Sequence, residues 1–339
     1  MADIRLKLRE ADRDRLKVMF LAKHARGDGS FHPVDGGHAV YHHELRTVLE
    51  GLLPNLSLGD RYEDLFPEPD YDYLFTLLNR GGFKNSEALA PVMAAWRGTP
   101  HMGASPALRI LGDDKHLMKL CASARGVATP ESEIYRLGNN YTAAPTFPWT
   151  RLVVKPNASS ASWGVKILDS WDEAVAHREW LYEEGGHDVL VERHVDGIEL
   201  AVPVVGGADG NPVFLPVMKY ISANDDRIRT YEEKRGLVPS TEGFQPFHEK
   251  DLCDLVIGEV EKMMPEVWPF DYGRFEFKVD PVTMRSSFIE LNMSCNLWSK
   301  KTLSLSWRSL GYSHAELVET ILAHSLLRQG VIDGVDVPS

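Results

Sequence analysis

The sequence lacks the features of several broad protein classes. Its three cysteines are odd in number and far apart, which argues against a disulfide framework or a zinc cluster. No apolar run approaches the roughly 20 residues that span a bilayer, and the first residues contain no apolar segment typical of a secretory signal. Acidic residues outnumber basic ones, 49 to 37, for a net charge of -12. We therefore expect a cytoplasmic protein that binds neither nucleic acid nor a membrane.

The order of local patterns predicts an α/β architecture. A chain of 339 residues suits two or three domains rather than one core. Strands are expected at residues 17–22 and 73–78, and helices at 39–52 and 86–96. This alternation predicts an N-terminal α/β domain that closes near residue 112.

A lysine before a loop of small residues indicates a possible phosphate site. Lys155 stands just before Pro156 at the end of the expected strand 151–156, and residues 157–164 (Asn-Ala-Ser-Ser-Ala-Ser-Trp-Gly) follow. Small side chains let backbone N–H groups approach an anion closely. The segment is either such a cradle or an ordinary loop rich in serine and glycine.

A predicted hairpin near the C-terminal end brings hard oxygen ligands together. Strand alternation places Arg274, Glu276 and Lys278 on one face, and Glu290 and Asn292 share a face of the next strand. Two carboxylates and a carboxamide suit Mg²⁺, which takes its other ligands from water and nucleotide phosphates. The alternative is the solvated polar face of an edge hairpin.

A third segment carries two acids after an apolar run. Glu192 follows Val189-Leu190-Val191, and Glu199 comes seven residues later, after the turn Asp196-Gly197. These carboxylates either contact the amino group of adenine and the hydroxyls of ribose or lie on the surface.

The order of the segments resembles the ATP-grasp superfamily, and more narrowly D-alanine–D-alanine ligases and their relatives that join amino acids in secondary metabolism. The resemblance covers roughly residues 75–325 and depends on the combination of motifs. The motifs are Asp114-Lys115, Val154-Lys155-Pro156, the small-residue loop, Val191-Glu192, Gly197-Ile198-Glu199, Arg274-Phe275-Glu276 and Glu290-Leu291-Asn292.

The resemblance implies an ATP-grasp (α+β) fold in which two subdomains sandwich ATP. Residues 1–112 would be a substrate-binding α/β domain, 113–190 the central lid subdomain, and 191–339 the C-terminal subdomain with the metal site. Family members commonly dimerise, so a homodimer is possible.

The resemblance also implies a role for each matching residue in binding ATP. Cations would neutralise the phosphates, lid serines would cover them, and a short segment would hold adenine and ribose. The cations would be Lys115, Lys155 and the loop residue Lys234, and the lid serines would be Ser160 and Ser162. Adenine and ribose would be held by Glu192, Val195 and Glu199.

The implied metal ligands are Glu276, Glu290 and Asn292, which would bind two Mg²⁺ ions, with Mn²⁺ as a possible substitute. Glu276 stands where these ligases usually have aspartate, but a glutamate is still a hard ligand. Arg274 would steady the acyl-phosphate and the tetrahedral species, and Lys234 would contribute to catalysis.

Several positions depart from the family pattern where substrates bind. Ala161 replaces a serine, Arg235 a tyrosine, Cys295-Asn296 a proline-glycine pair, and Lys301 a serine. We therefore expect Lys301, Asn296, Arg235 and His42 to contact substrates that do not form D-alanyl-D-alanine. Cys295 is interpreted as a packing residue.

The lysine pair and the histidine segment each keep a second interpretation. Lys301, with Lys300, either holds a substrate carboxylate or is exposed on a loop. His38 and His42 lie one helical turn apart, a spacing that zinc sites also use, but no third ligand is evident nearby.

The function expected is an ATP-dependent ligase that joins small-molecule carboxylate and amine substrates through an acyl-phosphate and releases ADP and phosphate. A role in specialised metabolism is expected. A cyclising ligase acting within one molecule, a nucleotide-binding protein without turnover, and a metal hydrolase that uses the histidines are the alternatives.

Overall fold

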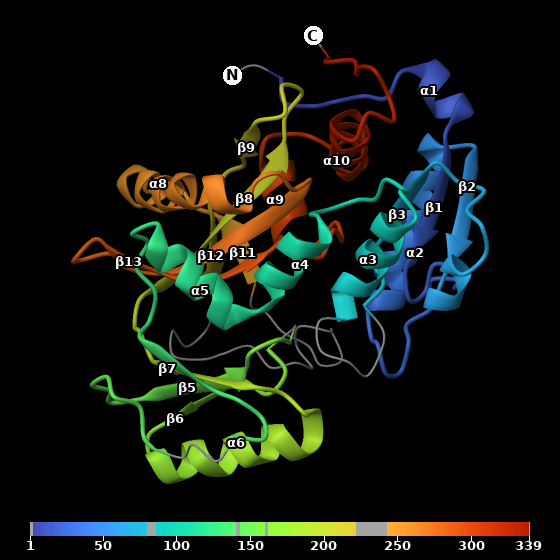
Figure 1. The fold of residues 1–339 in the computed structure, drawn as a ribbon. Helices are drawn as coiled ribbons and strands as arrows, with labels where there is room; N and C mark the ends of the chain where they lie inside the picture. The colour runs from blue at the N-terminus through green and yellow to red at the C-terminus, as the bar shows by residue number, and fades with distance from the viewer. Residues whose placement is uncertain (1–2, 80–85, 140–142, 160–161, 222–242, 339) are drawn as a thin grey trace.

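The chain folds around three β-sheets (Figure 1). The computed structural model describes residues 3–79, 86–139, 143–159, 162–221 and 243–338. The first sheet is parallel, in the order β2-β1-β3. Its strands are β1 (Lys17–Leu21), β2 (Asn55–Gly59) and β3 (Tyr73–Thr76), and its helical segments are α1 (Glu10–Arg15), α2 (His38–Leu52), η1 (Tyr62–Leu65), η2 (Ser86–Ala88) and α3 (Leu89–Trp96). The apolar residues 18–21 are all buried, as expected for a central parallel strand.

The second sheet and helix α6 (Trp171–Gly185) form the lower lobe in Figure 1. The sheet is antiparallel, in the order β4-β7-β5-β6, from β4 (Ser132–Tyr135), β5 (Leu152–Pro156), β6 (Lys166–Leu168) and β7 (Val189–Arg193). Ser170 caps α6 by accepting the backbone N–H of Glu173 at 3.3 Å. Gly186 ends the helix in the left-handed conformation.

The third sheet is antiparallel, in the order β11-β10-β8-β12-β13, with β9 beside β8. Its strands are β8 (Ile198–Gly206), β9 (Pro212–Phe214), β10 (Met218–Ile221), β11 (Gly243–Pro246), β12 (Tyr272–Asp280) and β13 (Arg285–Asn292). The helices of this part are α4 (Pro106–Asp113), α5 (Lys115–Ala124), α8 (Lys250–Val267), α9 (Thr302–Ser309) and α10 (His314–Arg328). Apolar residues of α5 and α8 share one core with β12 and β13.

A single hydrophobic core joins the two ends of the chain. Phe20 of β1 belongs to the same buried cluster as Tyr272 of β12 and Leu322 of α10. The Tyr73 hydroxyl donates a hydrogen bond to Ser325 of α10 at 2.6 Å. Helix α10 therefore fixes the first sheet against the third (Figure 1).

Most of the expected elements are confirmed within a few residues. The helix expected at 39–52 is α2, and the expected strands 17–22 and 73–78 are β1 and β3. The segment expected as one helix at 86–96 consists of the short η2 followed by α3.

The three predicted domains remain a proposal, with one adjustment. The boundary expected at residue 190 falls inside β7, and all of β7 pairs within the second sheet. A middle domain on this structure would therefore end after Arg193.

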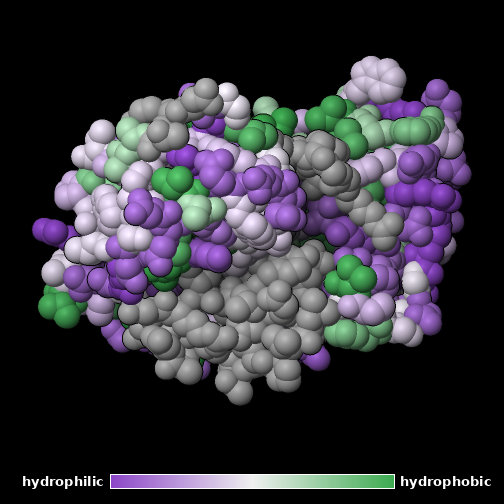
Figure 2. Space-filling model, turned by 90° about the horizontal axis from the view of Figure 1, so that it is seen from below, coloured by the Kyte–Doolittle hydropathy of each residue, from purple (hydrophilic) through white to green (hydrophobic). Residues whose placement is uncertain are grey.

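The described residues on the surface seen from below are mainly hydrophilic (Figure 2). On the described residues of this face, hydrophobic side chains appear as small separate groups (Figure 2). No helix in the described parts of the chain has both the length and the apolar composition needed to cross a membrane.

Candidate active site

A cavity of about 480 Å³ is lined by residues of all three sheets and of helix α2. Lys155 of β5, Glu276 of β12 and Glu290 of β13 belong to its wall, together with Thr76 of β3 and His42 of α2. Side chains from the beginning, the middle and the end of the chain therefore line one space.

Two lysines share one buried glutamate beside this cavity. The Lys155 ammonium donates to the carboxylate of Glu192 on the neighbouring strand, and Lys119 Nζ lies 3.0 Å from the other oxygen. The three residues are between 2% and 4% exposed. Burial alone would raise the pKa of Glu192, but the two lysines lower it overall, whereas burial lowers the pKa of Lys119 to about 8. Two ammonium groups against one carboxylate leave one net positive charge at neutral pH.

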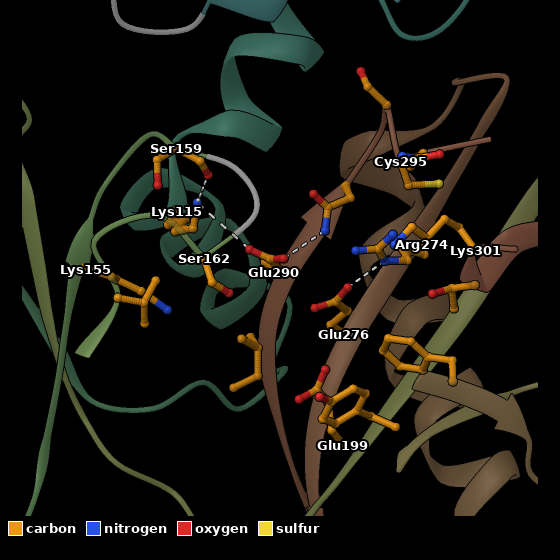
Figure 3. Close-up of a pocket in the computed structure, with 18 of the residues that line it drawn as sticks. Lys115, Lys155, Ser159, Ser162, Glu199, Arg274, Glu276, Glu290, Cys295 and Lys301 are labelled. Carbon is orange, nitrogen blue, oxygen red and sulfur yellow. Dashed lines mark hydrogen bonds and ion pairs between the residues drawn. The ribbon is translucent and has the colours of Figure 1, made fainter. Parts of the chain in front are cut away.

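Lys115 links the loop after β5 to the far side of the cavity. It is the first residue of α5, whose cap Asp114 accepts the Leu117 backbone N–H at 2.9 Å. Lys115 Nζ donates to the Ser159 carbonyl at 2.9 Å and lies 3.9 Å from a Glu290 carboxylate oxygen (Figure 3). This lysine therefore connects the small-residue loop with the acids on β13.

Three oxygen-bearing side chains gather where β12 and β13 pair. Glu276 lies opposite Glu290, and Arg274 lies opposite Asn292. Asn292 Nδ2 donates to Glu290 at 2.9 Å, so the amide carbonyl is not used in that bond. Arg274 Nε donates to Glu276 at 2.5 Å, and the pKa of Arg274, which burial would lower, is raised by this carboxylate (Figure 3).

A β-bulge gives β13 two consecutive residues that line the cavity. Glu276 pairs with Glu290 but Phe277 pairs with Phe288, which leaves Ile289 without a partner in the ladder. Phe288 consequently packs in the core, while Ile289 and Glu290 both line the cavity.

Residues at and before the start of β8 form another part of the cavity wall. Val195 and Glu199 line the wall, and Glu199 lies opposite Lys278 in the sheet. A Cβ atom on Gly197 would lie 2.4 Å from the carbonyl oxygen of Val279, and Gly197 has a φ of 129°. The turn into β8 therefore requires glycine.

Comparisons with known proteins agree with this architecture. No family model matches the chain. A D-alanine–D-alanine ligase of Pseudomonas putida is 26% identical over 287 residues, 81% of this chain and 83% of the relative. One of Polynucleobacter asymbioticus is 26% identical over 234 residues, 68% of this chain and 67% of the relative. The crystal structure of the Bacillus anthracis enzyme complexed with ATP matches 93% of this chain and 99% of that chain, with a TM-score of 0.71 and 18% identity.

The chain is similar in sequence to D-alanine–D-alanine ligases and shares their ATP-grasp fold. The structural match confirms the predicted fold, and the sequence relatives confirm the predicted class, an ATP-grasp ligase similar to D-alanine–D-alanine ligases.

The site residues expected of an ATP-grasp protein fall into two groups. Ser160, Lys234 and Arg235 lie outside the described residues. All the others line the one cavity: Lys115, Lys155, Ser162, Glu192, Val195, Glu199, Arg274, Glu276, Glu290, Asn292, Asn296, Lys301 and His42.

The surroundings of Glu192 differ from the expectation. Its carboxylate was expected to hold adenine or ribose, but Lys119 and Lys155 enclose it. The residues that follow it, 193–195, line the cavity as well.

The histidines of α2 face the cavity near the first sheet. His42 is 3% exposed, and burial, followed by the charges of His38 and His24, holds its pKa well below 6.5. Its Nδ1 accepts the His24 backbone N–H at 3.3 Å. Within the described ranges, the ligand atoms that converge belong to His24, His32 and Asp35 rather than to the His38–His42 pair considered for zinc.

Residues that follow β13, including Cys295, Asn296, Lys300 and Lys301, also line the cavity. Lys300 and Lys301 lie 5.4 and 6.0 Å from the ring centre of Trp298, whose backbone N–H is accepted by the Asn296 side chain at 2.8 Å. Cys295 is 4% exposed, and burial raises the pKa of its thiol to about 11, which agrees with a packing role.

Sequence reasoning missed three charged residues at the site. Lys119 lies one helical turn after Lys115, so a second lysine on the same face of α5 was the available signal. Arg109 and Glu87 line the cavity, but neither lies in a motif that the resemblance covers.

Proposed function

We propose that the chain is an ATP-dependent carboxylate–amine ligase for amino-acid-like substrates, with an acyl-phosphate intermediate. The observation that carries this proposal is that Lys115 and Lys155 line the same cavity as Glu276, Glu290 and Asn292. These two sets are what a metal-bound triphosphate requires: ammonium groups for its oxygens and hard oxygen ligands for its cations.

The buried lysines favour an anionic nucleotide in this cavity. Lys155, Lys119 and Glu192 carry one unbalanced positive charge in a group that is almost inaccessible to water. An uncompensated buried charge is unfavourable, so a phosphate beside Lys155 would stabilise the group.

The donor set also fits Mg²⁺. Glu276 and Glu290 offer carboxylates, and Asn292, which donates through Nδ2, offers its carbonyl oxygen. When bound, the metal would neutralise charge on the phosphates, and the three side chains would hold it. Lys115, 3.9 Å from Glu290, would lie on the phosphate side of this set.

The reaction follows from this arrangement of charges. A carboxylate oxygen of the first substrate attacks the γ-phosphorus as the bond to the bridging oxygen of ADP breaks, and ADP leaves. The amine nitrogen of the second substrate then attacks the acyl carbon, phosphate leaves with the electrons of the carbon–oxygen bond, and nitrogen releases a proton. Arg274, paired with Glu276, would stabilise the oxyanions of both steps.

The substrate end supports a product other than D-alanyl-D-alanine. Lys301 and Asn296 line the cavity where the family resemblance expects a serine and a glycine, and His42 lines it from α2. Lys301 would bind the carboxylate of the amine-donating substrate. A cytoplasmic location, a homodimer and a role in specialised metabolism are part of this proposal.

Product analysis tests the proposed route. Purified protein with ATP, Mg²⁺ and a mixture of amino acids and related acids should release ADP and phosphate in equal amounts. Formation of AMP and pyrophosphate would contradict the acyl-phosphate route. The mass of the product separates ligation of two molecules from ring closure within one, which loses water without gaining a second substrate.

A further inference from the structure

Arg109 of α4 is a buried guanidinium in the wall of the cavity. It is 6% exposed, and a Cβ atom added to Gly103 would meet its guanidinium nitrogens at 3.3–3.5 Å. The guanidinium therefore lies against the backbone of Gly103, and Arg109 lines the cavity.

The described residues leave this guanidinium without a hydrogen bond. Its Nε is buried and has no partner, and its nearest carboxylate, that of Glu87, is 3.8 Å from Nη1, beyond hydrogen-bond distance. A guanidinium has five N–H donors and stays charged at all physiological pH values. Glu87 offsets the charge of Arg109 but makes no hydrogen bond with it, so the buried Nε–H can donate to an anion in the cavity.

Arg109 and Glu87 together match the charges of an amino acid head group. Asn79 Nδ2 lies 3.4 Å from the other Glu87 oxygen, which holds the glutamate at the wall. The 3.8 Å gap separates one cation from one anion, so a zwitterion can place its carboxylate on Arg109 and its ammonium beside Glu87.

This pair comes from different elements than the side chains assigned to the reacting carboxylate. Arg274 and the metal ligands come from β12 and β13, whereas Glu87 and Arg109 come from η2 and α4. Arg109 and Arg274 both line the cavity, as does Cys295.

We propose that Arg109 and Glu87 hold the α-carboxylate and α-ammonium groups of the first substrate, so that the carboxylate activated by ATP is a second one, on the side chain. The substrate class is then an amino acid with two carboxylates. This inference rests on the proposed ligase function and adds the substrate to it.

Matched acids test the substrate class. Aspartate and glutamate, each in both chiral forms, are compared with succinate and glutarate, which lack the amino group, and with 3-aminopropanoate and 4-aminobutanoate, which lack the α-carboxylate. With ATP, Mg²⁺ and hydroxylamine, an amino diacid should give a side-chain hydroxamate identified by mass. Wild-type preference for acids without the α-carboxylate would overturn the inference.

Substitutions of Arg109 and Glu87 test which of them binds the α-carboxylate and which the α-ammonium group. Arg109→Gln should raise the KM for the amino diacid about 10- to 100-fold, since it removes charge-assisted hydrogen bonds. The KM for ATP should stay unchanged, and Arg109→Lys should recover part of the loss. Glu87→Gln should raise the KM for the amino diacid but not the KM for succinate or glutarate. Arg285→Gln, at an exposed position on β13, is the matched control.

The outcomes separate this inference from the proposed function. If the protein turns over a different acid and Arg109→Gln leaves that KM within twofold, the inference is wrong and the ligase proposal stands. If no acid is turned over, calorimetry with aspartate and glutamate on the protein with Mg²⁺ and a non-hydrolysable ATP analogue decides. Absence of binding overturns the inference, whereas failure of the protein to bind the ATP analogue contradicts the proposed function itself.

Discussion

Glu192→Gln isolates the charge balance behind the proposed phosphate site. The wild-type group has two ammonium groups and one carboxylate, each at most 4% exposed. The amide keeps the shape of the side chain but leaves the ammonium groups of Lys155 and Lys119 buried without a counter-ion. Removing one partner of a buried ion pair costs roughly 3–5 kcal/mol, so we expect a loss of unfolding free energy of that size.

Urea unfolding at pH 7, followed by tryptophan fluorescence, measures this loss. Glu266→Gln is the matched control, because Glu266 pairs with Arg125 at 3.5 Å on the surface and such pairs contribute less than about 1 kcal/mol. The double variant Glu192→Gln/Lys119→Met carries the same net charge as the wild-type group. It should therefore be more stable than Glu192→Gln alone.

Two results would refute this reasoning. A loss below about 1 kcal/mol for Glu192→Gln would mean that water or another group already balances the lysines. A double variant less stable than the single one would mean that Lys119 contributes packing or hydrogen bonding rather than unfavourable charge.

Three further predictions concern the same cavity. Burial lowers the pKa of Lys119 from 10.5 to about 8, so between these pH values the unfolded chain binds more protons than the folded one. The unfolding free energy of the wild type, relative to that of Lys119→Met, should therefore rise by up to roughly 3 kcal/mol from pH 8 to pH 10.5. Urea titrations at a series of pH values measure this rise. Lys155→Ala should weaken ATP binding in calorimetry, whereas Glu290→Gln should mainly lower kcat; the reverse pattern would contradict their assigned roles. Cys295→Ala should keep turnover, and alkylation of Cys295 at pH 7 should be slow, because burial raises its pKa to about 11; rapid alkylation would contradict its placement in the core.

Local patterns were sufficient where one segment decides its own structure. The apolar run 18–21 predicted β1, and α10 begins at a reciprocal capping box that Ser313 and Glu316 form within one turn of sequence. The polar residues of β12 and β13 predicted which oxygen-bearing side chains come together, because two-residue alternation sets which side chains share a face.

Alternation failed at one position of that hairpin. It would place Phe288 on the face of Glu290, but the bulge at Ile289 turns Phe288 into the core. A bulge depends on how two strands pair, so the sequence of one strand does not reveal it.

The sequence by itself therefore determined several of the elements, the order of the ATP-grasp motifs and the motif residues that line the cavity. Only the tertiary structure decided that Lys119 and Lys155 share Glu192, that α10 packs on the first sheet, and that Arg109 reaches the cavity beside Glu87. These are contacts between segments far apart in the chain. Their energies depend on burial and on the charges brought together by folding, and no local pattern encodes either quantity.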